Sequence, residues 1–126
     1  MPVLFVYGTL KRGCKNHLHI ADQRFLGQAR TVPGYALYDL GDYPGLVADA
    51  SDTAGVAGEL WEVDEAALAR LDVFEGVDEG LYQRQSVKLM DTVNHVQAHT
   101  YLYARNPGQR RIGTTWREAT PDHAPH

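Results

Sequence analysis

The sequence predicts an α+β fold, a small mixed β-barrel with a few flanking helices. Its 126 residues are enough for one domain whose core needs no disulfide or metal. Glycine and proline interrupt the chain frequently, so most of the segments between them have the length of strands. Only two segments have a helical pattern. Many short strands and few helices favour a closed or nearly closed barrel, with the helices outside it or across one end.

Seven segments have the apolar or alternating pattern of strands: residues 3–7, 24–32, 35–39, 45–48, 56–63, 82–90 and 96–103. Pro33-Gly34 and residues 43–45 mark turns between them. The two predicted helices cover residues 16–22 and 64–75. We expect these elements to form a single domain over residues 1–105. The chain becomes polar from residue 106, and we expect residues 106–126 to form a mobile C-terminal tail.

The first predicted strand ends at a loop that suits an oxygen-rich ligand. The apolar run 3–7 stops at Gly8, and a basic stretch that ends in Gly13 closes the loop. Gly8 has no Cβ, so the main-chain amides that follow a buried strand can approach an anionic or carbonyl oxygen. On these residues alone, the alternative is an ordinary turn after a strand.

The helix predicted over residues 64–75 ends with a carboxylate directed at the core. Asp64 is a good N-cap, and Gly76 is a natural C-terminal stop. Leu68, Leu71 and Glu75 are spaced i, i+3 and i+7, so they share one face of the helix. Apolar neighbours, nearby acids and the negative end of the helix dipole would raise the pKa of Glu75 toward that of a general base. Alternatively, this carboxylate reaches water from a frayed helix end.

Alternation along the next predicted strand places Tyr82 and Arg84 on one face. Tyr82 could cover a ligand or donate a hydrogen bond, and Arg84 could fix a carboxylate or brace the loop after the second helix. The alternative for this pair is a surface cross-strand contact. In the last predicted strand His99, Tyr101 and Tyr103 share a face, and aromatic packing is the simpler explanation for them.

Composition and charge exclude several classes of function. The formal net charge is -4, which disfavours a nucleic-acid partner. We see no secretory leader and no membrane-spanning run, so we expect a cytoplasmic protein with no membrane partner. The single cysteine, Cys14, cannot form an internal disulfide, and no histidine partner is specified by spacing. The six histidines lack the spacing of metal ligands, so we expect no metal.

Four separated segments form an ordered set: Phe5-Val6-Tyr7-Gly8-Thr9-Leu10-Lys11-Arg12-Gly13 with Asn16-His17, Gly58-Glu59-Leu60-Trp61-Glu62-Val63, Leu71-Asp72-Val73-Phe74-Glu75 and Tyr82-Gln83-Arg84. Together they resemble the γ-glutamylcyclotransferase-like family, and most closely its small branch that includes γ-glutamylamine cyclotransferase. The resemblance runs from about residue 3 to residue 105. It implies a compact β-barrel, a catalytic glutamate at Glu75 and no cofactor. It also implies a substrate cradle, a name kept below for Tyr7, Gly8, Thr9 and Leu10.

The reaction implied by this resemblance is the cyclisation of a small γ-glutamyl amine or peptide to 5-oxoproline, with release of the free amine. Glu75 would be the general acid/base, and the amides of residues 8–10 would hold the substrate carboxylate or the developing oxyanion. The leaving group would meet the loops 42–55 and 78–81. The main rival is a noncatalytic module that binds a small carboxylate in the same cradle, and a third candidate is a metal-dependent hydrolase. The sequence specifies neither the leaving amine nor the oligomeric state.

Overall fold

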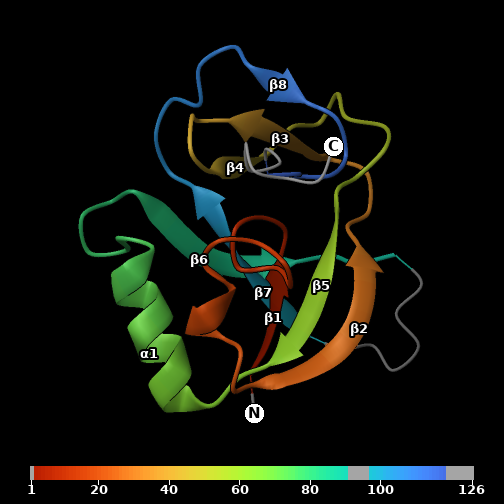
Figure 1. The fold of residues 1–126 in the computed structure, drawn as a ribbon. Helices are drawn as coiled ribbons and strands as arrows, with labels where there is room; N and C mark the ends of the chain where they lie inside the picture. Colours follow the sequence, from red (N-terminus) through yellow and green to blue (C-terminus); the bar gives the residue numbers. More distant parts are fainter. Residues whose placement is uncertain (1, 91–96, 119–126) are drawn as a thin grey trace, which may run out of the picture.

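The protein is described here from a computed structural model that covers residues 2–90 and 97–118. Figure 1 shows a curved sheet with one α-helix, α1 (Glu65–Phe74), packed against it. A short 3-10 helix, η1 (His17–His19), replaces the longer helix predicted over residues 16–22. The strands are β1 (Val3–Val6), β2 (Arg24–Arg30), β3 (Tyr35–Asp39), β4 (Pro44–Ala48), β5 (Ala57–Glu62), β6 (Tyr82–Val87), β7 (Ala98–Tyr103) and β8 (Arg111–Ile112).

The sheet is mixed and curls into a barrel-like form, as the sequence predicts. Its strand order is β2-β5-β1-β7-β4-β3-β8, and β6 pairs with β7 outside this path. Strand β7 runs parallel to β1 and β4 and antiparallel to β6. A single backbone bridge between Thr31 and Leu89 connects the chain just after β2 to the chain just after β6. This bridge joins β2, β5, β1, β7 and β6 into a ring.

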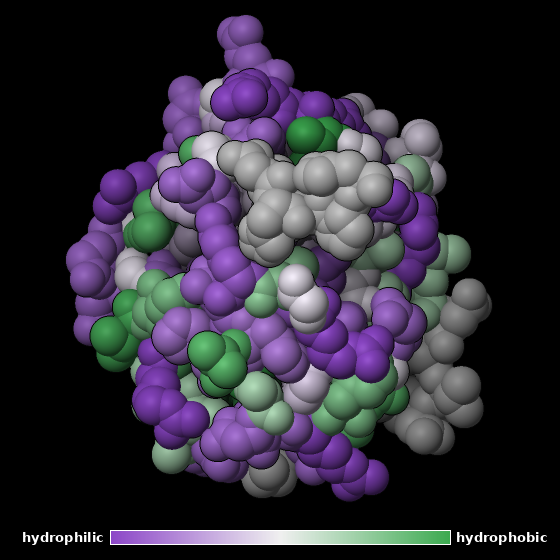
Figure 2. All heavy atoms as spheres, viewed as in Figure 1, coloured by the Kyte–Doolittle hydropathy of each residue, from purple (hydrophilic) through white to green (hydrophobic). Residues whose placement is uncertain are grey.

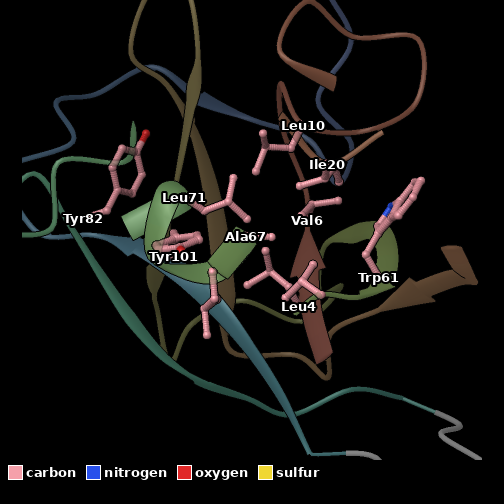
Figure 3. Close-up of a cluster of buried hydrophobic side chains, with 11 residues drawn as sticks. Leu4, Val6, Leu10, Ile20, Trp61, Ala67, Leu71, Tyr82 and Tyr101 are labelled. Carbon is pink, nitrogen blue, oxygen red and sulfur yellow. The ribbon is translucent and has the colours of Figure 1, made fainter. Parts of the chain in front are cut away.

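Strand β1 separates two hydrophobic clusters because its side chains alternate. Leu4 and Val6 belong to the cluster that packs against α1, whereas Phe5 and Tyr7 belong to the second cluster. Figure 3 shows the first cluster, in which Ala67 and Leu71 of α1 face Leu4 and Val6. This packing fixes the helix against the sheet beside the end of β1.

Helix α1 begins and ends as its sequence predicts. The Asp64 side chain accepts a hydrogen bond from the Ala67 N–H at 2.7 Å, so Asp64 is the N-cap. The helix ends in a Schellman motif, in which Gly76 has φ +68° and its N–H donates to the Val73 carbonyl. The N–H of Val77 donates to the Asp72 carbonyl at 3.0 Å and completes the motif.

The prediction of a tail from residue 106 is wrong for residues 106–118, which pack on the domain. Strand β8 pairs with β3, and Ala57 donates a backbone hydrogen bond to the Thr114 carbonyl. Trp116 is only 8% exposed and belongs to the second hydrophobic cluster. The polar composition of this segment gives no sign that it packs on the domain, because one buried indole and one strand pair are enough to hold it there. Residues 119–126 of the predicted tail, and residue 96 of the last predicted strand, lie outside the described residues.

Candidate active site

A cavity of about 200 Å³ opens where the end of β1 meets the end of α1. Residues 5–10, which comprise the end of β1 and the cradle, form one wall. The other walls come from residues 43–44 before and in β4, residues 74–75 at the end of α1, residues 81–82 at the start of β6 and residues 100–101 in β7, with Asn16 at one side. The cavity is therefore assembled from segments that are far apart in the sequence.

All four cradle residues line this cavity, and their amides are available to a ligand. The Gly8 carbonyl accepts from the Lys11 N–H at 3.1 Å, and the Thr9 carbonyl accepts from the Asn16 N–H at 2.9 Å. The Asn16 side-chain amide also donates to the Thr9 hydroxyl at 2.9 Å. Within residues 2–90 and 97–118, the N–H groups of Gly8, Thr9 and Leu10 donate to no protein acceptor. Unpaired successive amides of this kind suit an anion or a developing oxyanion.

The structure gives a more specific reason for glycine at position 8 than close approach of a ligand. A Cβ on Gly8 would lie 2.6 Å from Cγ of Pro44 and 3.0 Å from its Cδ. The carbonyl of Pro44 in turn accepts a hydrogen bond from the Tyr82 hydroxyl at 2.7 Å. Gly8 therefore allows the cradle, the start of β4 and β6 to pack together around the cavity.

A buried acid, Glu59 of β5, holds the basic loop that follows the cradle. Glu59 is 5% exposed, and its side chain accepts hydrogen bonds from the Arg12 N–H at 3.0 Å and from Arg12 Nε at 3.2 Å. The Trp61 indole donates to the same carboxylate at 3.2 Å. The Arg12 guanidinium lies over the Phe25 ring, 3.7 Å from its centroid. Sequence reasoning missed this role, although alternation along β5 already places Glu59 on the same face as Trp61.

Glu75 lines the cavity from the C-cap position of α1. No hydrogen bond joins its carboxylate to a protein group in the described part of the chain, and its oxygens keep some exposure, because no fully buried side-chain oxygen or nitrogen there lacks a partner. Burial raises the pKa of Glu75 to about 7. The predicted direction is confirmed, and burial is its cause; the nearby acids make no resolved contribution. The half-buried Glu75 therefore lines the same cavity as the cradle and is not an exposed residue of a frayed helix end.

Three tyrosines form cavity walls, and each hydroxyl is occupied by a protein acceptor. The Tyr7 hydroxyl donates to the Tyr101 carbonyl at 2.7 Å and accepts from the Leu46 N–H at 3.2 Å. The Tyr82 hydroxyl, which the sequence predicts as a donor, donates to the Pro44 carbonyl rather than remaining free. The Tyr101 hydroxyl donates to Asp72 Oδ1 at 2.7 Å. Burial raises the pKa of all three phenols, so they stay protonated at neutral pH and shape the cavity without acting as acids.

Arg84 does not line the cavity, and its predicted role in substrate binding is corrected on this point. Its guanidinium makes two hydrogen bonds to Asp72 of α1, at 2.9 and 3.1 Å. Burial would raise the pKa of Asp72, but the hydrogen bonds from Arg84 and Tyr101 hold it below its ordinary value. Arg84 is thus committed to a protein carboxylate, and it braces the last turns of α1, which carry Glu75, against β6.

The described residues give little support to a metal site, a thiolate nucleophile or a membrane-spanning helix. Within residues 2–90 and 97–118, no group of three or more His, Cys, Asp or Glu side chains is placed to hold a metal ion. Burial raises the pKa of the Cys14 thiol, which disfavours a thiolate nucleophile. No helix in the described part of the chain combines the length and the apolarity needed to cross a bilayer. Glu75 is the one ionisable carboxyl among the described residues that line the cavity.

Comparison with known proteins identifies the family of the chain. The family model for "Gamma-glutamyl cyclotransferase, AIG2-like" matches residues 4–118. A protein from Rattus norvegicus named gamma-glutamylaminecyclotransferase is 41% identical over 96 residues, which cover 71% of this chain and 64% of that protein. A protein from Niallia circulans named gamma-L-glutamyl-butirosin B gamma-glutamyl cyclotransferase is 32% identical over 130 aligned residues, covering 98% of this chain and 81% of that protein.

The fold is also that of a solved relative. The crystal structure of an AIG2-like protein from Mus musculus matches with a TM-score of 0.72 and 35% identity, over 85% of this chain and 80% of that one. The family match extends through β8 and Trp116, in agreement with their packing on the domain. Both curated relatives are named as enzymes that act on γ-glutamyl groups. The chain belongs to the gamma-glutamyl cyclotransferase, AIG2-like family of enzymes.

Proposed function

We propose that this protein cyclises the γ-glutamyl group of a small γ-glutamyl amine or peptide to 5-oxoproline and releases the free amine, with Glu75 as general acid/base. One observation carries the proposal. A carboxylate whose pKa lies at about 7, and which has no protein hydrogen-bond partner among the described residues, lines the same cavity as the unpaired amides of residues 8–10. A proton acceptor and an oxygen-binding site are the two parts that this reaction requires.

The reaction needs no protein nucleophile, because the substrate contains both reacting groups. The α-amine and the γ-carbonyl belong to one γ-glutamyl group, and a bent conformation brings them together. Intramolecular alignment of this kind can be worth roughly 7 to 11 kcal/mol. Glu75 removes a proton from the α-ammonium, and the amine then attacks the γ-carbonyl carbon. The protonated Glu75 gives this proton to the departing nitrogen as the original amide bond breaks. The attacking nitrogen then loses a second proton through Glu75 to the released amine, which departs as an ammonium ion, so the lactam nitrogen keeps one proton and Glu75 is regenerated as a carboxylate.

The cradle is the best candidate to hold the α-carboxylate of the γ-glutamyl group. No lysine or arginine is found among the described residues that line the cavity. The unpaired amides of Gly8, Thr9 and Leu10 are therefore the available donors for an anion. The free Cys14 suits the reducing conditions of the cytoplasm, which we propose as the location.

The test is to incubate the protein with a panel of γ-glutamyl amines and γ-glutamyl peptides and to measure 5-oxoproline. We expect release of 5-oxoproline together with an equal amount of free amine. Glu75→Gln should keep the fold and most of the substrate binding, measured by calorimetry, and lose turnover. Glu79→Gln is the matched control, because Glu79 is an exposed acid that does not line the cavity.

Each rival has a distinct outcome in the same experiment. Binding of γ-glutamyl compounds without any 5-oxoproline would identify a noncatalytic carboxylate-binding module. Activity that disappears with a chelator would identify a metal-dependent hydrolase. Full turnover by the Glu75→Gln protein would remove Glu75 as the general base.

A further inference from the structure

The mouth of the cavity is aromatic. Among the described residues that line the cavity, only Tyr43 and Phe74 are classed as exposed, with exposed fractions of 37% and 40%. The cradle residues lie deeper, since all four are buried. The face of the molecule seen in Figure 2 is mostly hydrophilic, and Phe74 is one of the large apolar side chains that remain exposed. The cradle thus belongs to the buried part of the lining, and Tyr43 and Phe74 line the cavity where it meets solvent.

Contacts behind the mouth hold these two residues in place. The Phe74 ring packs against the ring of His19, with 4.2 Å between centroids and 34° between planes. Tyr43 comes directly before Pro44, whose carbonyl is fixed by the Tyr82 hydroxyl. The Tyr43 carbonyl accepts a backbone hydrogen bond from the Leu40 N–H at 3.0 Å. The Phe74 ring and the Tyr43 backbone are therefore held in place by the protein before any ligand binds.

The charges around the mouth disfavour an anion there. Glu75 is the only charged side chain among the described lining residues, and it is acidic. The C-terminal end of α1, where the helix dipole is negative, also reaches the cavity at Phe74 and Glu75. The loop that follows adds the exposed acids Asp78 and Glu79. A carboxylate on a leaving group inside the cavity would face Glu75, with no lysine or arginine among the described lining residues to pair with. Lys15, which donates to the Asp42 carbonyl, and Arg105, which donates to the Glu79 carbonyl, lie outside this lining.

We infer that the outer end of the cavity is a subsite for a flat, apolar leaving group, and that Phe74 and Tyr43 are specificity-determining residues. This inference rests on the proposed function and names the class of amine that it releases. If the cradle holds the α-carboxylate of the γ-glutamyl group, the leaving amine extends toward the two aromatic rings. The favoured substrates are γ-glutamyl derivatives of arylalkylamines, which can stack on Phe74 and Tyr43 and carry no second carboxylate.

The test compares three probes that differ one feature at a time: γ-L-glutamyl-ethylamide, γ-L-glutamyl-phenethylamide and γ-L-glutamyl-phenylalanine. We expect the phenethylamide to have a kcat/KM about tenfold above that of the ethylamide, because it adds only a phenyl ring. We expect phenylalanine as leaving group, which adds only a carboxylate to the phenethylamide, to lower kcat/KM about tenfold.

Variants show whether Phe74 and Tyr43 set this preference. Phe74→Ala should reduce the ratio of kcat/KM for phenethylamide over ethylamide about tenfold, and Tyr43→Ala should also reduce it. Val73→Ala is the matched control, since Val73 is the neighbouring helix residue, is 76% exposed and does not line the cavity. This control should keep the wild-type ratio. Thermal unfolding of each variant checks that it is folded.

The outcomes separate this inference from the function on which it rests. If none of the probes yields 5-oxoproline, the proposed function fails and the inference fails with it. If the wild-type protein turns over the ethylamide as efficiently as the phenethylamide, only the aromatic subsite is overturned. A ratio that is unchanged in both Phe74→Ala and Tyr43→Ala would overturn their assignment as specificity-determining residues.

Discussion

Replacing Glu75 with glutamine is expected to stabilise the protein at alkaline pH while it removes activity. Burial raises the pKa of Glu75 from an ordinary value of 4.5 to about 7. Between these values the folded protein still holds a proton that the unfolded chain has lost, so the free energy of unfolding falls as pH rises through this window and stays lower above it. At about 1.4 kcal/mol for each unit of pKa, the whole effect is on the order of 3 kcal/mol. Glutamine does not titrate and removes this dependence.

The measurement is urea unfolding of the wild-type and Glu75→Gln proteins at several values between pH 5 and pH 8. Over this range the wild-type protein should lose roughly 2–3 kcal/mol of unfolding free energy relative to the variant. Comparing the two proteins cancels the titration of all other groups. In the wild type, kcat/KM should rise with pH and reach half of its maximum at about pH 7, because the base must be deprotonated. Parallel stability curves for the two proteins would refute the raised pKa and the assignment built on it.

Three further substitutions test other parts of the structure. Gly8→Ala should lower kcat/KM by about tenfold or more because its Cβ would lie 2.6 Å from Pro44, whereas Gly113→Ala, with open space around it, should have normal kinetics. Arg84→Met should lower the free energy of unfolding by about 1–2 kcal/mol, because it removes two hydrogen bonds to the Asp72 carboxylate of α1. An unchanged midpoint of urea unfolding would show that Arg84 does not stabilise α1 against β6. Trp116→Ala should cost about 3–5 kcal/mol in the same assay, and a loss near zero would mean that this segment is not part of the core.

Local sequence pattern predicts the elements whose stability is decided locally. The bounds of β3 agree with the predicted strand over residues 35–39, and α1 lies within the predicted helix because its cap and its apolar face are both visible in the sequence. The same helical periodicity directs Glu75 toward the cavity. The packing of residues 106–118 is not predicted, because it depends on a distant partner: the two residues of β8 form a strand only by pairing with β3. Nothing in a run of two residues indicates such a partner.

The candidate site could be predicted as far as it depends on spacing along one element. Gly8 and Glu75 line the cavity, but their distance in the sequence gave no direct sign that they would meet. Arg84 could not be assigned correctly, because its partner Asp72 belongs to another element and only the folded chain brings them together. Tyr43 lies in the loop 42–55 that the sequence predicts to meet the leaving group, but the pattern does not single it out, and Phe74 is not predicted because it is an exposed helix residue. Tertiary packing, rather than any local propensity, decides all of these contacts.

The parallel pairing of β1 with β7 has a consequence for how activity returns during refolding. These strands lie at opposite ends of the described chain, and the Tyr7 hydroxyl reaches the Tyr101 carbonyl across 94 positions of sequence. Contacts of such long range form slowly, because the entropy of closing a large loop is lost before any contact repays it. The cavity has no wall on one side until this closure is complete. A refolding chain should therefore gain its catalytic competence in the last and slowest kinetic phase, after α1 has already formed.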